Sequence, residues 1–100
     1  MCGAPDQDTL EPITNGGKEA VVQGRVVRGG SPLGGAYVRL LDSTGEFTAE
    51  VQASATGQFR FYAAPGTWTL RVLAPGTSPV DATVTAATGV VAEAEIDVPA

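Results

Sequence analysis

One side chain in the sequence is strongly nucleophilic, the thiol of Cys2. A thiolate attacks electrophiles, accepts sulfane sulfur as a persulfide and binds soft metals. We expect removal of Met1, which would leave Cys2 with a free amine beside its thiol. No basic residue stands near Cys2, and Asp6 and Asp8 disfavour the thiolate. Cys2 is therefore a candidate sulfur acceptor or metal ligand, and the alternative is an unreactive residue in an unstructured segment.

Histidine is absent from the chain. Its absence excludes Ser-His-Asp triads, Cys-His dyads and histidine-ligated metal sites within this sequence. A single cysteine forms neither an internal disulfide nor a thiolate zinc cage. We therefore expect a protein that is not an enzyme and that carries no cofactor or metal. Glu93, Glu95 and Asp97 alternate along one stretch, and we interpret them as a solvated strand face rather than a calcium site.

The charge balance disfavours nucleic acid and anionic membranes as partners; a basic protein partner is compatible with it, but moderate acidity more often only keeps a protein in solution. The chain has 11 Asp and Glu against 6 Lys and Arg, a net charge of −5, whereas nucleic-acid and anionic-membrane binding need a basic face. The first residues have neither the basic nor the apolar region of a signal peptide. No segment is long and apolar enough to span a membrane. Because one cysteine suits a reducing compartment, we expect a cytoplasmic protein that binds neither nucleic acid nor membranes.

Short stretches of alternating apolar and polar residues, separated by turn residues, fill most of the chain. This period of two is typical of β-strands, and no stretch has a helical period. Seven such strands favour one β-sandwich domain over residues 19–100. Residues 1–18 lack periodicity, and we expect a flexible N-terminal arm there. The predicted strands are 20–28, 36–41, 46–53, 58–63, 67–73, 80–85 and 90–98.

The stretch 57–76 holds two of the three Phe residues and the only Trp. Phe59 and Phe61 share one face of the first strand, and Trp68 lies on the apolar face of the second. Two alternating runs joined by Pro-Gly predict a β-hairpin at the centre of the core. Trp68 is accordingly expected in the core rather than in a sugar-binding platform.

Outward positions of the predicted strands carry the candidate surface contacts. The outward arginines could pair with Glu50 or Gln52 across neighbouring strands, or dock an acidic partner; these arginines are Arg25, Arg39, Arg60 and Arg71. In the strand 46–53, the alternation predicts that Phe47, Ala49 and Val51 point inward. The candidate surface contacts are Tyr37, Tyr62, Arg39 and Arg60.

Two backbone features are also predicted. Gly24, inside the first strand, indicates a bulge or a close approach of another backbone. Residues 29–32, Gly-Gly-Ser-Pro, predict a turn.

Four segments together resemble the carboxypeptidase regulatory-like pattern. They are Val22-x-Gly24-x-Val26, Pro32-Leu33-Gly34-Gly35-Ala36-x-Val38-x-Leu40, Thr56-Gly57-x-Phe59-x-Phe61 and Pro65-Gly66-Thr67-Trp68-Thr69-Leu70. The resemblance implies a seven-stranded Greek-key sandwich similar to transthyretin and Cna-B domains. The hydroxyisourate hydrolases of this fold depend on histidines, which this chain lacks, so their activity is excluded.

The whole chain resembles a small actinobacterial family of unknown function. The resemblance rests on the first five residues, Met-Cys-Gly-Ala-Pro, and on three internal runs at 39–43, 46–51 and 53–57. Members are typically encoded beside a thiosulfate sulfurtransferase, which implies an accessory role in sulfur metabolism with that enzyme as partner. Two alternatives stay open: a sulfur-carrier or metal-binding redox protein that uses Cys2, and a purely structural interaction module with an exposed strand edge.

Overall fold

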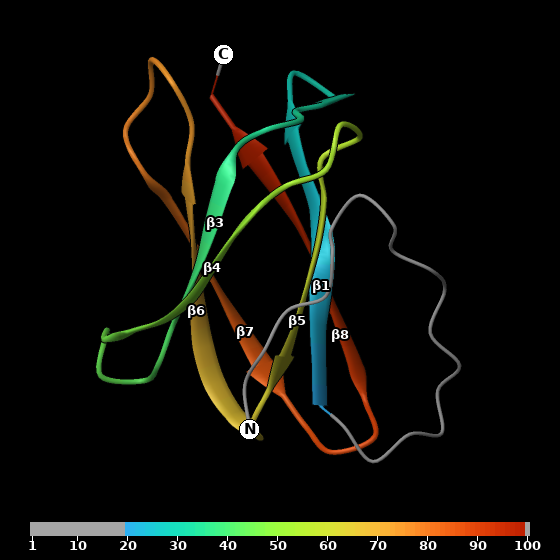
Figure 1. The fold of residues 1–100 in the computed structure, drawn as a ribbon, viewed down its shortest axis with the longest axis vertical. Helices are drawn as coiled ribbons and strands as arrows, with labels where there is room; N and C mark the ends of the chain where they lie inside the picture. Colours follow the sequence, from blue (N-terminus) through green and yellow to red (C-terminus); the bar gives the residue numbers. More distant parts are fainter. Residues whose placement is uncertain (1–19, 100) are drawn as a thin grey trace.

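A computed structural model describes residues 20–99, and every regular element in this range is a β-strand (Figure 1). Apolar residues alternate with polar ones along most strands, so most strands have one face that is more buried than the other. The predicted arm at 1–18, with Cys2, lies outside the described residues. The strands are β1 (Ala20–Arg28), β2 (Ser31–Pro32), β3 (Tyr37–Leu41), β4 (Phe47–Gln52), β5 (Gln58–Ala63), β6 (Gly66–Leu73), β7 (Val80–Ala86) and β8 (Val91–Val98).

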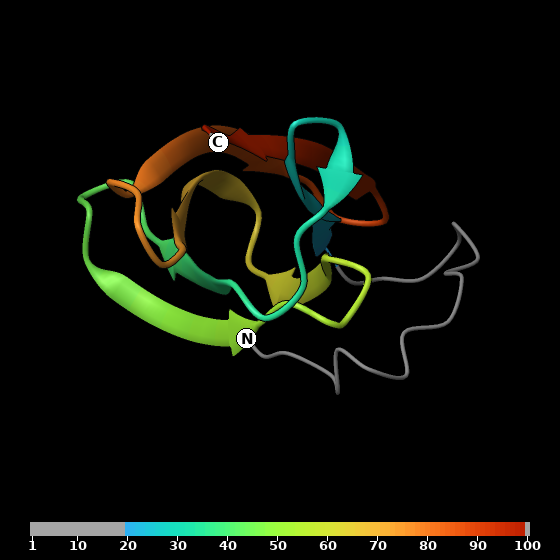
Figure 2. The ribbon, with the colours of Figure 1, turned by 90° about the horizontal axis from the view of Figure 1, so that it is seen from above.

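The strands form two sheets that pack face to face. Sheet A is built around β1, which pairs with β8 in parallel along one edge and with β5 and the short β2, both antiparallel, along the other. Sheet B is antiparallel in the order β4-β3-β6-β7. β7 and β8 lie against each other and join the sheets along one side (Figure 2). The predicted all-β sandwich is confirmed.

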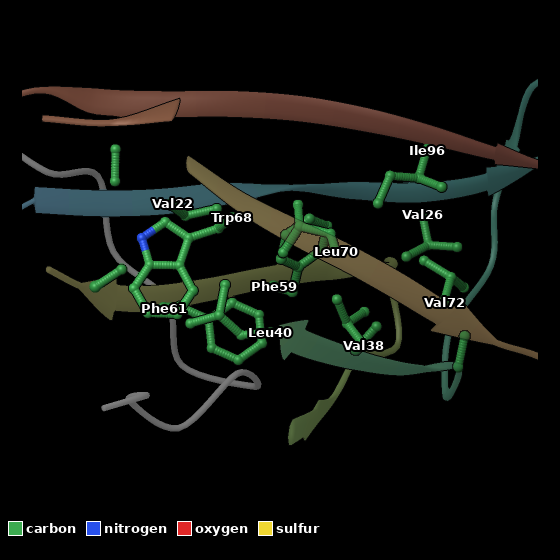
Figure 3. Packing of buried hydrophobic residues seen from close by; sticks show 14 of the residues in the cluster. Val22, Val26, Val38, Leu40, Phe59, Phe61, Trp68, Leu70, Val72 and Ile96 are labelled. Carbon is green, nitrogen blue, oxygen red and sulfur yellow. The ribbon is translucent and has the colours of Figure 1, made fainter. Parts of the chain in front are cut away.

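The core fills the space between the sheets. Phe59 and Phe61 from sheet A meet Leu40 and Leu70 from sheet B, and all four side chains are fully buried. The two phenylalanine rings are tilted at 56°, with centroids 6.2 Å apart. Trp68 closes one end of the core beside Phe61 (Figure 3). The inward side chains follow the alternation in the sequence, because successive side chains of a strand point to opposite faces.

The predicted hairpin at 57–76 is wrong. β5 pairs with β1 in sheet A, whereas β6 pairs with β3 and β7 in sheet B. The Pro-Gly segment therefore carries the chain from one sheet to the other. Two strands that each have an apolar face can bury those faces by lying side by side or by facing one another, and here they face one another. The aromatic residues of the stretch do lie in the core, as expected.

Two further details differ from the predictions. Ser31–Pro32 forms β2, which pairs with Val27 and Arg28, so the predicted turn reduces to Gly29–Gly30 and the described residues hold eight strands rather than seven. Phe47 was expected in the core but is 61% exposed. The pairing of β3 with β4 shifts register at Leu40/Leu41, which leaves Thr48 without a partner. One extra residue sends the preceding side chain to the opposite face.

Candidate functional site

The structure separates the four candidate surface residues into two pairs on opposite sides of the sandwich. Tyr37 and Arg39 lie on the outer face of sheet B, on β3. Arg60 and Tyr62 lie on the outer face of sheet A, on β5. The two tyrosines therefore do not form a common surface, and Cys2 lies outside the described residues.

The outer face of sheet B exposes two aromatic rings. Tyr37 is 47% exposed, and Phe47 joins this face because of the bulge at Thr48. The guanidinium of Arg39 stands over the Phe47 ring, with Cζ 5.9 Å from the ring centroid, within the range of a cation–π contact. Tyr37, Arg39 and Phe47 thus form a continuous stripe along β3 and the start of β4.

A row of four charges crosses the same face. Glu50, Arg39, Arg71 and Asp81 occupy matching positions on β4, β3, β6 and β7. Arg39 Nε donates to Glu50 Oε2 at 2.6 Å, so Arg39 is the one of the four outward arginines that pairs with Glu50. Arg71 holds Asp81 with two parallel bonds, Nε to Oδ1 at 2.9 Å and Nη2 to Oδ2 at 3.0 Å. The stripe and this row together make the sheet B patch: Tyr37, Arg39, Phe47, Glu50, Arg71 and Asp81.

The Arg71–Asp81 pair has a consequence for acid stability. The hydrogen bonds from Arg71 hold the pKa of Asp81 below its ordinary value of 3.8. A carboxylate whose pKa is lower in the folded state stabilises the fold above its unfolded pKa and loses that effect as the pH falls. We therefore expect the stability difference between the wild type and Asp81→Asn to shrink as the pH drops below 3.8.

Urea unfolding at a series of pH values between about 5 and 2 measures this difference. The pair is exposed to solvent, so the effect is small and weaker at high salt. A constant difference across the whole series would contradict the assignment.

On the outer face of sheet A, the candidate surface residues are less exposed than those on sheet B. Arg60 is only 7% exposed, and its Nε donates to Gln23 Oε1 at 2.8 Å. Tyr62 is half-buried. Arg25 and Glu95 form an exposed ion pair at 3.1 Å on this face. Arg60 therefore offers little surface to a partner, whereas Arg25 supplies an exposed, paired arginine for comparison with the sheet B patch.

Other candidates from the sequence are placed as follows. Trp68 is 8% exposed, and its Nε1–H donates to the Ala64 carbonyl at 2.8 Å, so the ring belongs to the core as expected. Within residues 20–99, no three acidic or thiol side chains gather closely enough to hold a metal ion. In the same range, no helix has the length and apolarity that a membrane crossing requires.

Residues 2–98 match the model of a family described as "Protein of unknown function (DUF1416)". The chain belongs to this family. It is 63% identical over 75 residues to two uncharacterized proteins of Mycobacterium tuberculosis strain H37Rv, Rv0814c and Rv3118. Each alignment covers 73% of this chain and 75% of the relative. An uncharacterized protein of Mycolicibacterium smegmatis is 70% identical over 57 residues, which cover 56% of this chain and 63% of the relative.

The expected membership of a family of unknown function is thus confirmed. The expected gene neighbourhood with a sulfurtransferase stays a prediction. Sequence reasoning found Tyr37 and Arg39 of the sheet B patch. It placed Phe47 in the core and did not pair Arg71 with Asp81, because the partner strand of β6 could not be read from alternation alone.

Proposed function

We propose that this chain is a non-enzymatic accessory protein that binds a protein partner through the sheet B patch. The partner that the resemblance implies is a thiosulfate sulfurtransferase, and the setting is sulfur metabolism in the cytoplasm. The proposal includes a Greek-key sandwich of the carboxypeptidase regulatory-like type.

The observation that carries the proposal is the exposure of aromatic side chains on a single face. Of the six aromatic residues in the chain, Phe59, Phe61 and Trp68 are buried and Tyr62 is half-buried on sheet A, whereas Tyr37 and Phe47 are 47% and 61% exposed on the outer face of sheet B. Exposed aromatics beside arginine are the residue types that dominate binding energy in protein interfaces. Packing of the core does not account for these two exposed rings, whereas a partner that covers them does.

Binding to the purified sulfurtransferase encoded beside this chain tests the proposal, with isothermal calorimetry as the measurement. We expect a complex whose affinity falls about tenfold or more in Tyr37→Ala and in Phe47→Ala. Val90→Ala is the matched control, because Val90 is 45% exposed but lies outside the patch. The proposal fails if the wild type does not bind the enzyme, or if the three variants bind it equally well.

The sulfur-carrier alternative depends on Cys2 and is tested in the same mixture. After incubation with thiosulfate and the enzyme, intact mass is recorded with and without reductant. A reversible gain of about 32 Da, absent in Cys2→Ser, would make the chain a persulfide carrier. An unchanged mass together with a stable complex leaves the accessory role.

A further inference from the structure

We infer that the partner surface that docks on the sheet B patch presents a carboxylate flanked by apolar side chains, and that this carboxylate bridges Arg39 and Arg71. The inference rests on the proposed function only in that the partner is a protein. Three features of the patch carry it: the order of its charges, the donors that its arginines leave over, and the position of its aromatic rings.

The charges across the sheet place two cations side by side between two anions. From β4 to β7 the row reads Glu50, Arg39, Arg71, Asp81, so the two cations are direct cross-strand partners at the centre and the anions stand outside. Like charges directly opposite one another destabilise a sheet. Each arginine is paired with the carboxylate on its outer side, and no carboxylate stands between the two arginines in the row. A carboxylate placed between them would remove the repulsion.

The arginines also keep donors for such a ligand. Glu50 takes the Nε–H of Arg39, and Asp81 takes Nε–H and one Nη2–H of Arg71. Among the hydrogen bonds within residues 20–99, none uses Nη1 or Nη2 of Arg39 or Nη1 of Arg71. The two side chains are 43% and 40% exposed. Because their own carboxylates fix them in place, little side-chain freedom is lost when a further carboxylate binds.

The rings define what must surround the carboxylate. Tyr37 and the Leu41–Phe47 pair lie on either side of Arg39 along β3, about 13 Å apart at the usual rise per residue of a strand. A partner that covers both rings brings apolar side chains to each side of its acid. Water is then excluded from the charged contact, which strengthens the contact.

A second copy of the chain fits the patch poorly. The row of charges is the same in either direction, so a two-fold axis through its centre sets arginine against arginine and acid against acid. Nucleic acid and other polyanions fit poorly as well, because the net charge of the chain is −5. A single acidic side chain within an otherwise apolar partner surface meets neither obstacle.

Selection from a random-peptide display library on the full-length protein tests the inference. We expect the recovered peptides to carry Asp or Glu next to aliphatic or aromatic residues. Their affinity should fall about tenfold or more in the double variant Arg39→Ala/Arg71→Ala. Arg39→Lys should also weaken binding, since lysine lacks the planar fork. Arg25→Ala is the matched control, because Arg25 is an exposed, ion-paired arginine on the other sheet.

Three results would overturn the inference: recovered peptides without an acid, binding that survives loss of both arginines, or a homodimer in sedimentation velocity that the double variant dissolves. Circular dichroism confirms that each variant is folded. The proposed function is judged separately. If the sulfurtransferase binds equally to the wild type and the double variant, the inference fails and the accessory role stands. If acidic peptides bind as expected but the enzyme does not, the inference stands without that partner.

Discussion

Gly24→Ala is expected to lower the free energy of unfolding by about 3 kcal/mol, the upper range for overpacking a tightly packed site. A Cβ atom at this position would lie 1.7 Å from the carbonyl oxygen of Ala94 and 3.0 Å from Cζ of Phe59. Ala94 is the parallel partner of Gly24 on β8. The obstacle is thus backbone, which cannot rotate away, and β8 must separate from β1 to make room. The close approach predicted from the sequence is confirmed.

Urea unfolding followed by circular dichroism measures this loss. Thr83→Ala is the control, because Thr83 also lies inside a strand but is exposed, and its replacement should change stability by less than about 0.5 kcal/mol. An unfolding midpoint of Gly24→Ala equal to that of the wild type would show that the two strands are not in close contact at this point.

Trp68→Ala is expected to cost about 3–5 kcal/mol, the usual cost for truncating a large buried ring. Such a loss is a large share of the 5–15 kcal/mol that stabilises a typical domain, so we expect a partly unfolded variant at about 37 °C. The ring fills the end of the core beside Phe61 and Val22 (Figure 3). Its removal also leaves the Ala64 carbonyl without the indole donor.

Trp68→Phe separates these two contributions. Phenylalanine keeps most of the packing but has no N–H to donate. We therefore expect the free energy of unfolding of Trp68→Phe to lie between those of the wild type and Trp68→Ala. Circular dichroism is the readout, because the variants lack the only tryptophan of the chain. A Trp68→Ala protein as stable as the wild type would place the ring outside the core and reopen its use as a ligand platform.

The positions of the strands could be predicted because each one carries its own signal. Alternation along Phe59–Phe61 and Trp68–Leu70–Val72 defines the buried faces, and glycine, proline and aspartate mark the ends. Which strands pair could not be predicted in this way. The pairing of β5 with β1 rather than β6 depends on how two apolar faces meet, and alternation is the same in both arrangements.

The position of Phe47 could have been predicted from the turn that precedes it. Asp42 N donates to the Glu46 carbonyl at 2.9 Å, and Gly45 has a φ of 86°, so the loop has three residues and ends in a left-handed one. Such a loop sets Leu41 opposite Phe47. Because Leu41 follows the inward Leu40, both side chains belong on the outer face, and the bulge at Thr48 restores the alternation.

The candidate site was predicted only in part. The alternation along each strand identified Tyr37, Arg39, Tyr62 and Arg60 as outward-facing residues. It does not tell which of the two sheets a strand belongs to. The row of four charges depends on the register of β4, β3, β6 and β7. The central pair, β3 and β6, is far apart in sequence, so its register could not be predicted. The role of Cys2 stays a prediction, because Cys2 lies outside the described residues.

The most direct test of the account is a nuclear magnetic resonance titration of the isotope-labelled full-length chain with the purified sulfurtransferase. If the sheet B patch binds the enzyme, the amide signals that shift or broaden first belong to β3, β4 and β6, with Tyr37, Arg39 and Phe47 among them, while those of Arg25 and Glu95 on sheet A stay unchanged. Perturbations centred on sheet A, or a spectrum unaffected by the enzyme, would contradict the account.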